Sequence, residues 1–131
     1  MIGYVTIGAL DSEKAGVFYD AVFGALGIER KLEGGGWIGY GEVGAEGEGF
    51  AACHTAICPP FDGQPARAGN GIMVAYTAKD AAAVDAAHAA ALANGGSDEG
   101  APGHRPPGTP GFYAAYVRDP TGNKLCVFAA A

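Results

Sequence analysis

The chain has 131 residues, of which 49% are hydrophobic, and a formal net charge of −6 at pH 7. This length predicts one domain, and the acidic balance argues against a nucleic-acid partner, because nucleic acids select basic surfaces. No run of about 18 apolar residues occurs, so we expect no membrane partner. Three cysteines and an N-terminus unlike a signal peptide predict a reduced, cytoplasmic protein.

The first half of the chain predicts a strand, a helix and three more strands. Apolar and polar residues alternate over 4–8, as in a half-buried strand. Asp11 or Ser12 can cap the helix that follows, and Gly27 suits its left-handed stop. Glycine-separated apolar runs then predict strands over 28–32, 37–43 and 50–57.

The second half predicts the same order of elements. We expect modules over residues 1–58 and 71–131, joined by a Pro- and Gly-rich crossover over 59–70. The second module predicts a strand over 72–77, a helix capped by Asp80 and ended at Gly95-Gly96, and a weak strand over 97–100. A loop over 101–111 then leads to strands over 112–118 and 124–128, joined by a turn.

The two halves are related by a constant shift of 69 residues. Three pairs carry it: Val5 and Val74, Asp11 and Asp80, Gly27 and Gly96. A repeated strand-helix-strand-strand-strand order predicts an α+β fold of two βαβββ modules, with helices on one face of each sheet and the other face lining one cleft.

Several segments resemble the glyoxalase/bleomycin resistance protein/dioxygenase superfamily, also called the vicinal oxygen chelate superfamily. Residues 112–125, FYAAYVRDPTGNKL, are similar to its terminal hairpin. Residues 1–8, the helix ending in Phe18-Tyr19-Asp20 and residues 84–92 are similar to its first strand and its two helices. The resemblance implies the paired-module fold over nearly the whole chain, and it implies a homodimer.

The resemblance also implies a divalent metal held by the first, fourth, fifth and eighth strands. Tyr4 and Met73 stand where members commonly have His, and Cys126 stands where they have Glu. A hydroxyl, a thioether and a thiol are poor donors for Mg, Mn, Ni or Fe(II), so we predict no metal and no cofactor. The shift of 69 points to Ile57 at the fourth-strand position, although the nearby His54 can also face the cleft.

We expect a cleft that is mainly uncharged. Its candidate ligand-binding residues are Tyr4, Thr6, Trp37, His54, Met73, Arg105, Lys124, Cys126 and Phe128. Arg105 suits a carboxylate or phosphate group, and Met73 adapts to irregular ligands. Cys126 is either a nucleophile or an inert buried thiol, and His54 is either a general base or a packed side chain. No catalytic residue is assigned.

Two functional hypotheses follow, and a third stays open. The first is a glyoxalase-like protein that lacks the usual metal site and binds a small, mainly apolar molecule. The alternative is a glyoxalase I-type lyase, or another metal-dependent enzyme of the superfamily, whose site is rebuilt from His54, Tyr4 and Cys126. The third is a structural or regulatory domain without a ligand. The sequence does not identify the ligand.

Overall fold

The computed structural model describes all 131 residues. The first half forms β1 (Val5–Gly8), α1 (Ser12–Gly24), β2 (Ile28–Gly34), β3 (Trp37–Glu42), the 3-10 helix η1 (Gly49–Ala52) and β4 (Thr55–Cys58). The second half forms β5 (Val74–Thr77), α2 (Ala81–Ala93), β6 (Ser97–His104), β7 (Tyr113–Arg118) and β8 (Lys124–Ala129). The first and last residues of β5 lie 69 positions after those of β1, and the same is true of α2 and α1.

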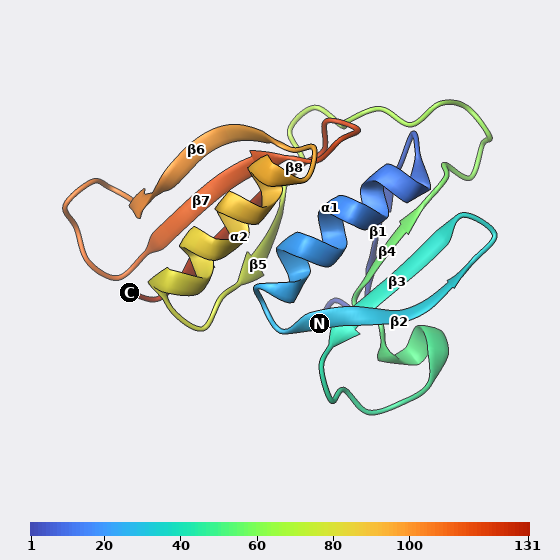
Figure 1. The fold of residues 1–131 in the computed structure, drawn as a ribbon, viewed down its shortest axis with the longest axis horizontal. Coiled ribbons are helices and arrows are strands. Elements are labelled where there is room, and N and C mark those ends of the chain that lie inside the picture. Colours follow the sequence, from blue (N-terminus) through green and yellow to red (C-terminus); the bar gives the residue numbers. More distant parts are fainter.

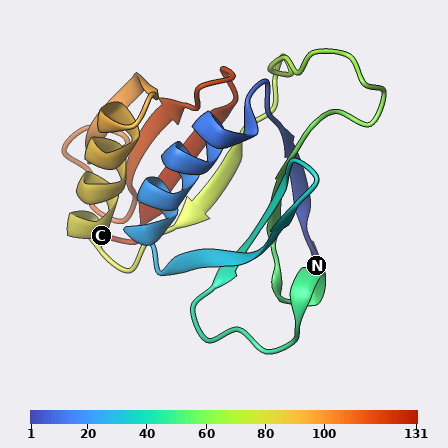
Figure 2. The ribbon, with the colours of Figure 1, turned by 45° about the vertical axis from the view of Figure 1, so that its right-hand side comes forward.

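The predicted α+β fold of paired modules is confirmed. The strands form two four-stranded sheets, in the orders β1-β4-β3-β2 and β5-β8-β7-β6. In each sheet the first strand of the module pairs in parallel with the last. The two helices pack against each other and lie together on one side of the strands (Figures 1 and 2). Neither helix has the length and apolar character needed to cross a bilayer.

One hydrophobic core serves both modules. Phe18, Tyr19 and Phe23 on α1 are fully buried, and the ring of Phe23 meets that of Tyr76 on β5 at 4.9 Å. The alanine-rich α2 contributes small side chains, which allow the helices to approach closely. Both helices begin as predicted, since the Asp11 and Asp80 carboxylates accept backbone N–H groups of the first turn.

The strand predicted over 50–57 is wrong in its first half. Residues 49–52 form η1, and β4 begins only at Thr55. The reason lies on β3, where Gly41 has no side chain and the Ala52 carbonyl occupies the space a Cβ would need. The short helix therefore folds over the outward face of the first sheet, and the ring of Phe50 packs edge-on against Tyr4 at 4.7 Å.

The loop predicted over 101–111 is also wrong in its first part. Strand β6 continues to His104 instead of stopping at Gly100. It is an edge strand with register irregularities between Asp98 and Gly100 and between Gly100 and Gly103. An edge position and bulges accommodate Pro102, which a central strand would not tolerate.

Candidate ligand-binding site

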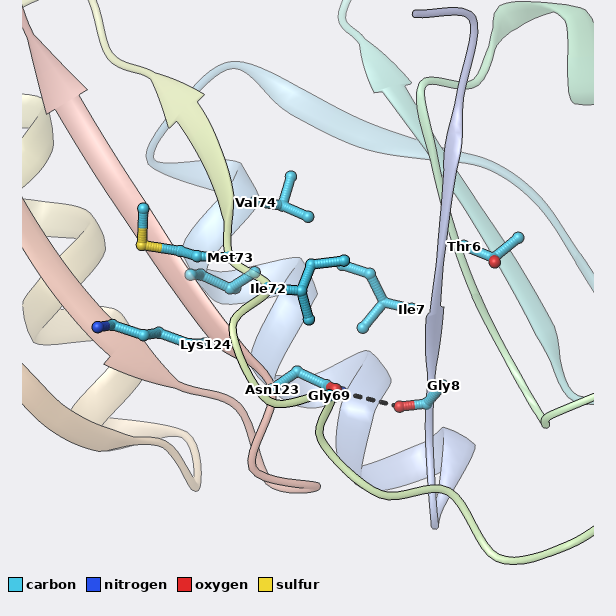
Figure 3. A pocket seen from close by; sticks show the side chains of 10 residues that line it. Thr6, Ile7, Gly8, Gly69, Ile72, Met73, Val74, Asn123 and Lys124 are labelled. Atoms are coloured by element: carbon cyan, nitrogen blue, oxygen red, sulfur yellow. Dashed lines mark hydrogen bonds between the residues drawn. The ribbon is translucent and has the colours of Figure 1, made fainter.

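The seam between the modules contains a small hollow. Strands β1 and β5 belong to separate sheets, so each turns an unpaired edge toward the seam. The hollow encloses about 180 Å³ and is lined by Thr6, Ile7, Gly8, Gly69, Ile72, Met73, Val74, Asn123, Lys124 and Leu125. Figure 3 shows Ile7 and Ile72 pointing toward one another across it, while Met73 and Lys124 lie together on the β8 side. One end is closed by Asn123, whose Nδ2 donates to the Gly8 carbonyl at 2.9 Å (Figure 3, dashed line).

The outward face of the second sheet adjoins this hollow through Lys124. Side chains alternate along β8, so Leu125, Val127 and Ala129 enter the core. Lys124, Cys126 and Phe128 take the opposite face, away from the helices. On neighbouring strands, Ala75 and Tyr116 are the partners of Cys126. The three β8 candidates therefore share one face of the second sheet.

Two cations lie over one aromatic ring on this face. The Arg105 guanidinium is 5.7 Å, and the Lys124 ammonium 5.6 Å, from the centre of the Tyr116 ring. Arg105 is held by donating to the Ala101 carbonyl at 2.6 Å. Neither cation forms an ion pair, whereas nearby Arg118 is paired with Glu99. The ring attracts both cations without neutralising them.

Tyr116 is not among the candidate ligand-binding residues predicted from the sequence. The signal was present, because Tyr116 and Cys126 are cross-strand partners in the hairpin whose turn was predicted. Phe112 was missed in the same way, and its ring lies 5.1 Å from that of Phe128. These aromatic groups extend the apolar part of the face beyond the hollow.

Cys126 has the properties of an inert thiol. It is 1% exposed. Burial raises its pKa, against opposing effects of the Tyr116 hydrogen bond and of the Arg105 and Lys124 charges. A protonated, covered thiol is a weak nucleophile. The structure therefore supports the packing interpretation of this residue.

The aromatic candidates of the first module lie elsewhere. Tyr4 is 53% exposed and contacts Phe50, which in turn lies 6.1 Å from the Trp37 ring. Neither Tyr4 nor Trp37 lines the hollow that Met73 shares with Thr6. His54 is also separate, because its ring faces Phe23 and Tyr76 at 6.3 Å and 6.0 Å.

The pairing of the strands settles the fourth-strand position. Val5 pairs with Thr55, whereas its counterpart Val74 pairs with Leu125, so β4 and β8 are related by a shift of 70. The counterpart of Cys126 is therefore Ala56, which faces outward beside Thr6. Ile57 pairs with Ile7 and enters the core, so the shift of 69 gave the wrong face.

These residues do not fit the divalent metal that the resemblance implies. The four positions hold Tyr4, Ala56, Met73 and Cys126, and an alanine has no donor atom at all. No three His, Cys, Asp or Glu side chains converge anywhere in the structure. Hard divalent ions require several oxygen or nitrogen donors, which this set does not supply.

Comparison with known proteins identifies the class. The Glyoxalase/Bleomycin resistance protein/Dioxygenase superfamily matches residues 1–127, and the chain belongs to this superfamily. A glyoxalase/bleomycin resistance protein from Albidiferax ferrireducens T118 is a similar solved structure, with 36% identity, 98% of each chain covered and a TM-score of 0.83.

More distant solved structures share the fold. Lactoylglutathione lyase from Agrobacterium tumefaciens is 26% identical, with 98% of this chain and 92% of that chain covered and a TM-score of 0.63. A glyoxalase/bleomycin resistance protein/dioxygenase family enzyme from Burkholderia phytofirmans PsJN is 18% identical over 99% of this chain and 98% of that chain, with a TM-score of 0.70. A search of curated proteins gives no match.

Proposed function

We propose that this glyoxalase-like protein binds a small molecule with an apolar body and an anionic group, without a divalent metal. The observation that carries the proposal is the pair of cations, Arg105 and Lys124, over the ring of Tyr116. Both are free of carboxylate partners on a protein whose net charge is −6. An anion is the ligand group that such a pair attracts, and the Arg105 fork suits a carboxylate or phosphate.

The apolar body of the ligand would lie along the seam. Met73 and Ile72 line the hollow, and Phe128 and Phe112 extend the face on the far side of Cys126. A hollow of about 180 Å³ takes one group of a ligand rather than the whole molecule. The remainder would rest on the open face beside Tyr116.

Binding of paired acids and alcohols tests this proposal. We expect benzoate and 1-naphthoate to raise the melting temperature and to bind in calorimetry, and benzyl alcohol to bind far more weakly. Lys124→Gln should weaken naphthoate binding about tenfold or more, because a hydrogen bond to a charged group contributes about 1.5–3 kcal/mol.

The matched control is Lys14→Gln, which removes a lysine from α1, outside the hollow and the Tyr116 face. It should leave the affinity for naphthoate unchanged. Equal losses in both variants, or equal binding of acid and alcohol, would refute the proposed anion site.

A lyase activity is the second candidate, and the lactoylglutathione lyase of A. tumefaciens favours it. It would require a metal site rebuilt from His54, Tyr4 and Cys126. The arrangement of these residues argues against it, because His54 turns toward the core residue Tyr76 and Cys126 faces away from the core. Stoichiometric metal in untagged protein, with EDTA-sensitive turnover of a hemithioacetal, would favour the lyase instead.

The homodimer and the cytoplasmic location stay predictions. The first rests on membership of the superfamily, and the second on three free cysteines. Light scattering at micromolar concentration tests the first, and fractionation of the host cell tests the second.

A further inference from the structure

A second, larger hollow opens at the other end of the seam. It encloses about 490 Å³, which lies within the range typical of small-molecule sites. The unpaired edge of β5 forms one wall, and the starts of β1 and β4 form the other. Ile2, Val5, Leu26 and Ile28 contribute apolar surface, and His54 and Thr55 lie at its polar end.

The two hollows are related by the internal symmetry of the fold. In the first, β1 residues Thr6, Ile7 and Gly8 face the start of β8, where Lys124 and Leu125 lie. In the second, their counterparts Ala75, Tyr76 and Thr77 on β5 face the start of β4. The strand shift of 70 matches His54 to Lys124 and Thr55 to Leu125.

The matched hollows differ in charge. Lys124 is the one charged residue lining the first hollow. The second has one Glu and one Lys, Glu42 and Lys79, so its lining charges cancel. Burial lowers the pKa of His54 below its ordinary value, although the nearby Glu42 has an opposing effect. The neutral form of the imidazole is therefore favoured at pH 7. The second hollow therefore suits an uncharged ligand.

A chain of three side chains fixes the imidazole. Nδ1 of His54 lies 2.8 Å from Oγ1 of Thr55, which lies 2.9 Å from the hydroxyl of Tyr76. The Tyr76 hydroxyl has no further partner, so the two hydroxyl groups can turn and the hydrogen bonds can run in either direction. The imidazole changes tautomer to match, by exchanging a proton with water. Nε2 of His54 is left free: it accepts when Nδ1 carries the proton, and it donates when Nδ1 accepts from Thr55.

We propose that this second hollow is a separate binding site for a small neutral molecule that carries one hydroxyl or carbonyl group. The apolar walls hold its hydrocarbon part, and the oxygen bonds to Nε2 of His54. A carbonyl accepts a hydrogen bond from Nε2–H, and a hydroxyl bonds to either tautomer. The site is independent of the anion site, with which it shares only Val74.

Nuclear magnetic resonance with cyclohexanol and cyclohexanone tests the site. Both should shift the His54 ring resonances saturably, and methylcyclohexane, their hydrocarbon counterpart, should bind at least fivefold more weakly, the effect of one neutral hydrogen bond. Cyclohexanecarboxylate should leave His54 unshifted. Hydrocarbon binding as tight as alcohol binding would refute the role of Nε2.

Two variants locate the ligand. Thr77→Trp fills the hollow from an exposed position, so the fold should survive and cyclohexanol binding should be lost. His54→Phe keeps a ring but no nitrogen, and should weaken cyclohexanol about fivefold or more. The control His88→Phe alters a histidine of α2 that pairs with Asp98 of β6, and this variant should bind cyclohexanol normally. Unchanged binding in Thr77→Trp, or shifts at Thr6 and Met73 instead, would place the ligand elsewhere and overturn the proposal.

Discussion

The hydroxyl of Tyr19 donates a 2.6 Å hydrogen bond to the buried carboxylate of Asp119. Tyr19 lies on α1 of the first module, and Asp119 begins the turn between β7 and β8 of the second. The same carboxylate also accepts the backbone N–H groups of Thr121, Gly122 and Asn123. The turn that marks the superfamily is therefore tied to the other half of the chain.

Tyr19→Phe should lower the free energy of unfolding by about 1.5–3 kcal/mol, because the lost bond is buried and its acceptor is charged. Urea unfolding at pH 7 measures the change. Tyr113→Phe is the matched control, since Tyr113 donates a bond of equal length to Asp85 on the surface. Its effect should be much smaller, and similar losses in the two variants would contradict the importance of burial.

Alkaline pH should destabilise the protein through its buried tyrosines. Burial raises the pKa of Tyr76 to about 12, and it also raises that of Tyr19, where Asp119 adds to the effect. Below pH ~10, the ordinary tyrosine pKa, both states are neutral and the stabilisation is complete. Above it, the unfolded chain ionises first, so stability falls as pH rises toward 12.

Tyr76→Phe isolates one contribution to this fall. Urea unfolding from pH 8 to 11.5 should show a loss about 2 kcal/mol smaller than in the unchanged protein. This is most of the ~2.7 kcal/mol that separates a pKa of about 12 from the ordinary value of ~10. The variant also loses its bond to Thr55, so each curve is compared with its own value at pH 8. Parallel curves would show that Tyr76 does not titrate in this way.

Gly96 should tolerate no side chain. A Cβ there would lie 2.5 Å from the Phe18 ring and 2.8 Å from the carbonyl oxygens of Ala91 and Arg118. Gly96→Ala should therefore lower the free energy of unfolding by about 1–3 kcal/mol, because the new methyl group overpacks this position. In Gly24→Ala the new methyl group meets nothing within 4 Å, and the change should stabilise α1 by about 0.5–1 kcal/mol. Chemical unfolding of both variants tests the contrast, which a stable Gly96→Ala protein would contradict.

A carboxylate at position 73 should repel the anionic ligand. Met73 shares the first hollow with Lys124, so Met73→Glu places a negative charge where we propose that the anion binds. Affinity for naphthoate should fall about tenfold, a change of about 1.4 kcal/mol. Met73→Gln has the same shape without the charge and should bind nearly normally. Equal affinities of the two variants for naphthoate, measured by calorimetry, would show that position 73 does not lie near the bound anion.

Local signals predicted most of the fold. The alternation of apolar and polar residues, the acidic helix caps and the glycines at the helix ends predicted the strands and helices of both modules. Each of these signals acts within a few residues of the chain. The helix stops show the limit of the internal repeat. Gly27 and Gly95 adopt the left-handed conformation, with φ of 74° and 91°. Gly96, which the shift of 69 matches to Gly27, instead makes room for Phe18.

The site was less predictable, because it depends on which face each strand presents. The second module has one more residue than the first between its helix and its last strand, so the shift changes from 69 to 70 there. A slip of one residue turns a side chain to the other face of a strand. At the fourth-strand position, which the sequence left open, the shift of 69 gives Ile57, whereas the strand pairing gives Ala56. The position of Arg105 over Tyr116 follows two bulges in β6, which no local pattern indicates.

The bond from Asn123 to the Gly8 carbonyl has a consequence for how the halves can move. Together with the bonds from Tyr19 to Asp119 and from the Leu10 amide to Thr121, it clasps the start of the first module to the last turn of the second. A half expressed alone would present these polar groups to water. Two copies that exchanged halves would have to break all three bonds and form them again between the two chains. If all three form again, the exchange changes only the connectivity of the chains and leaves the fold of each pair of modules unchanged.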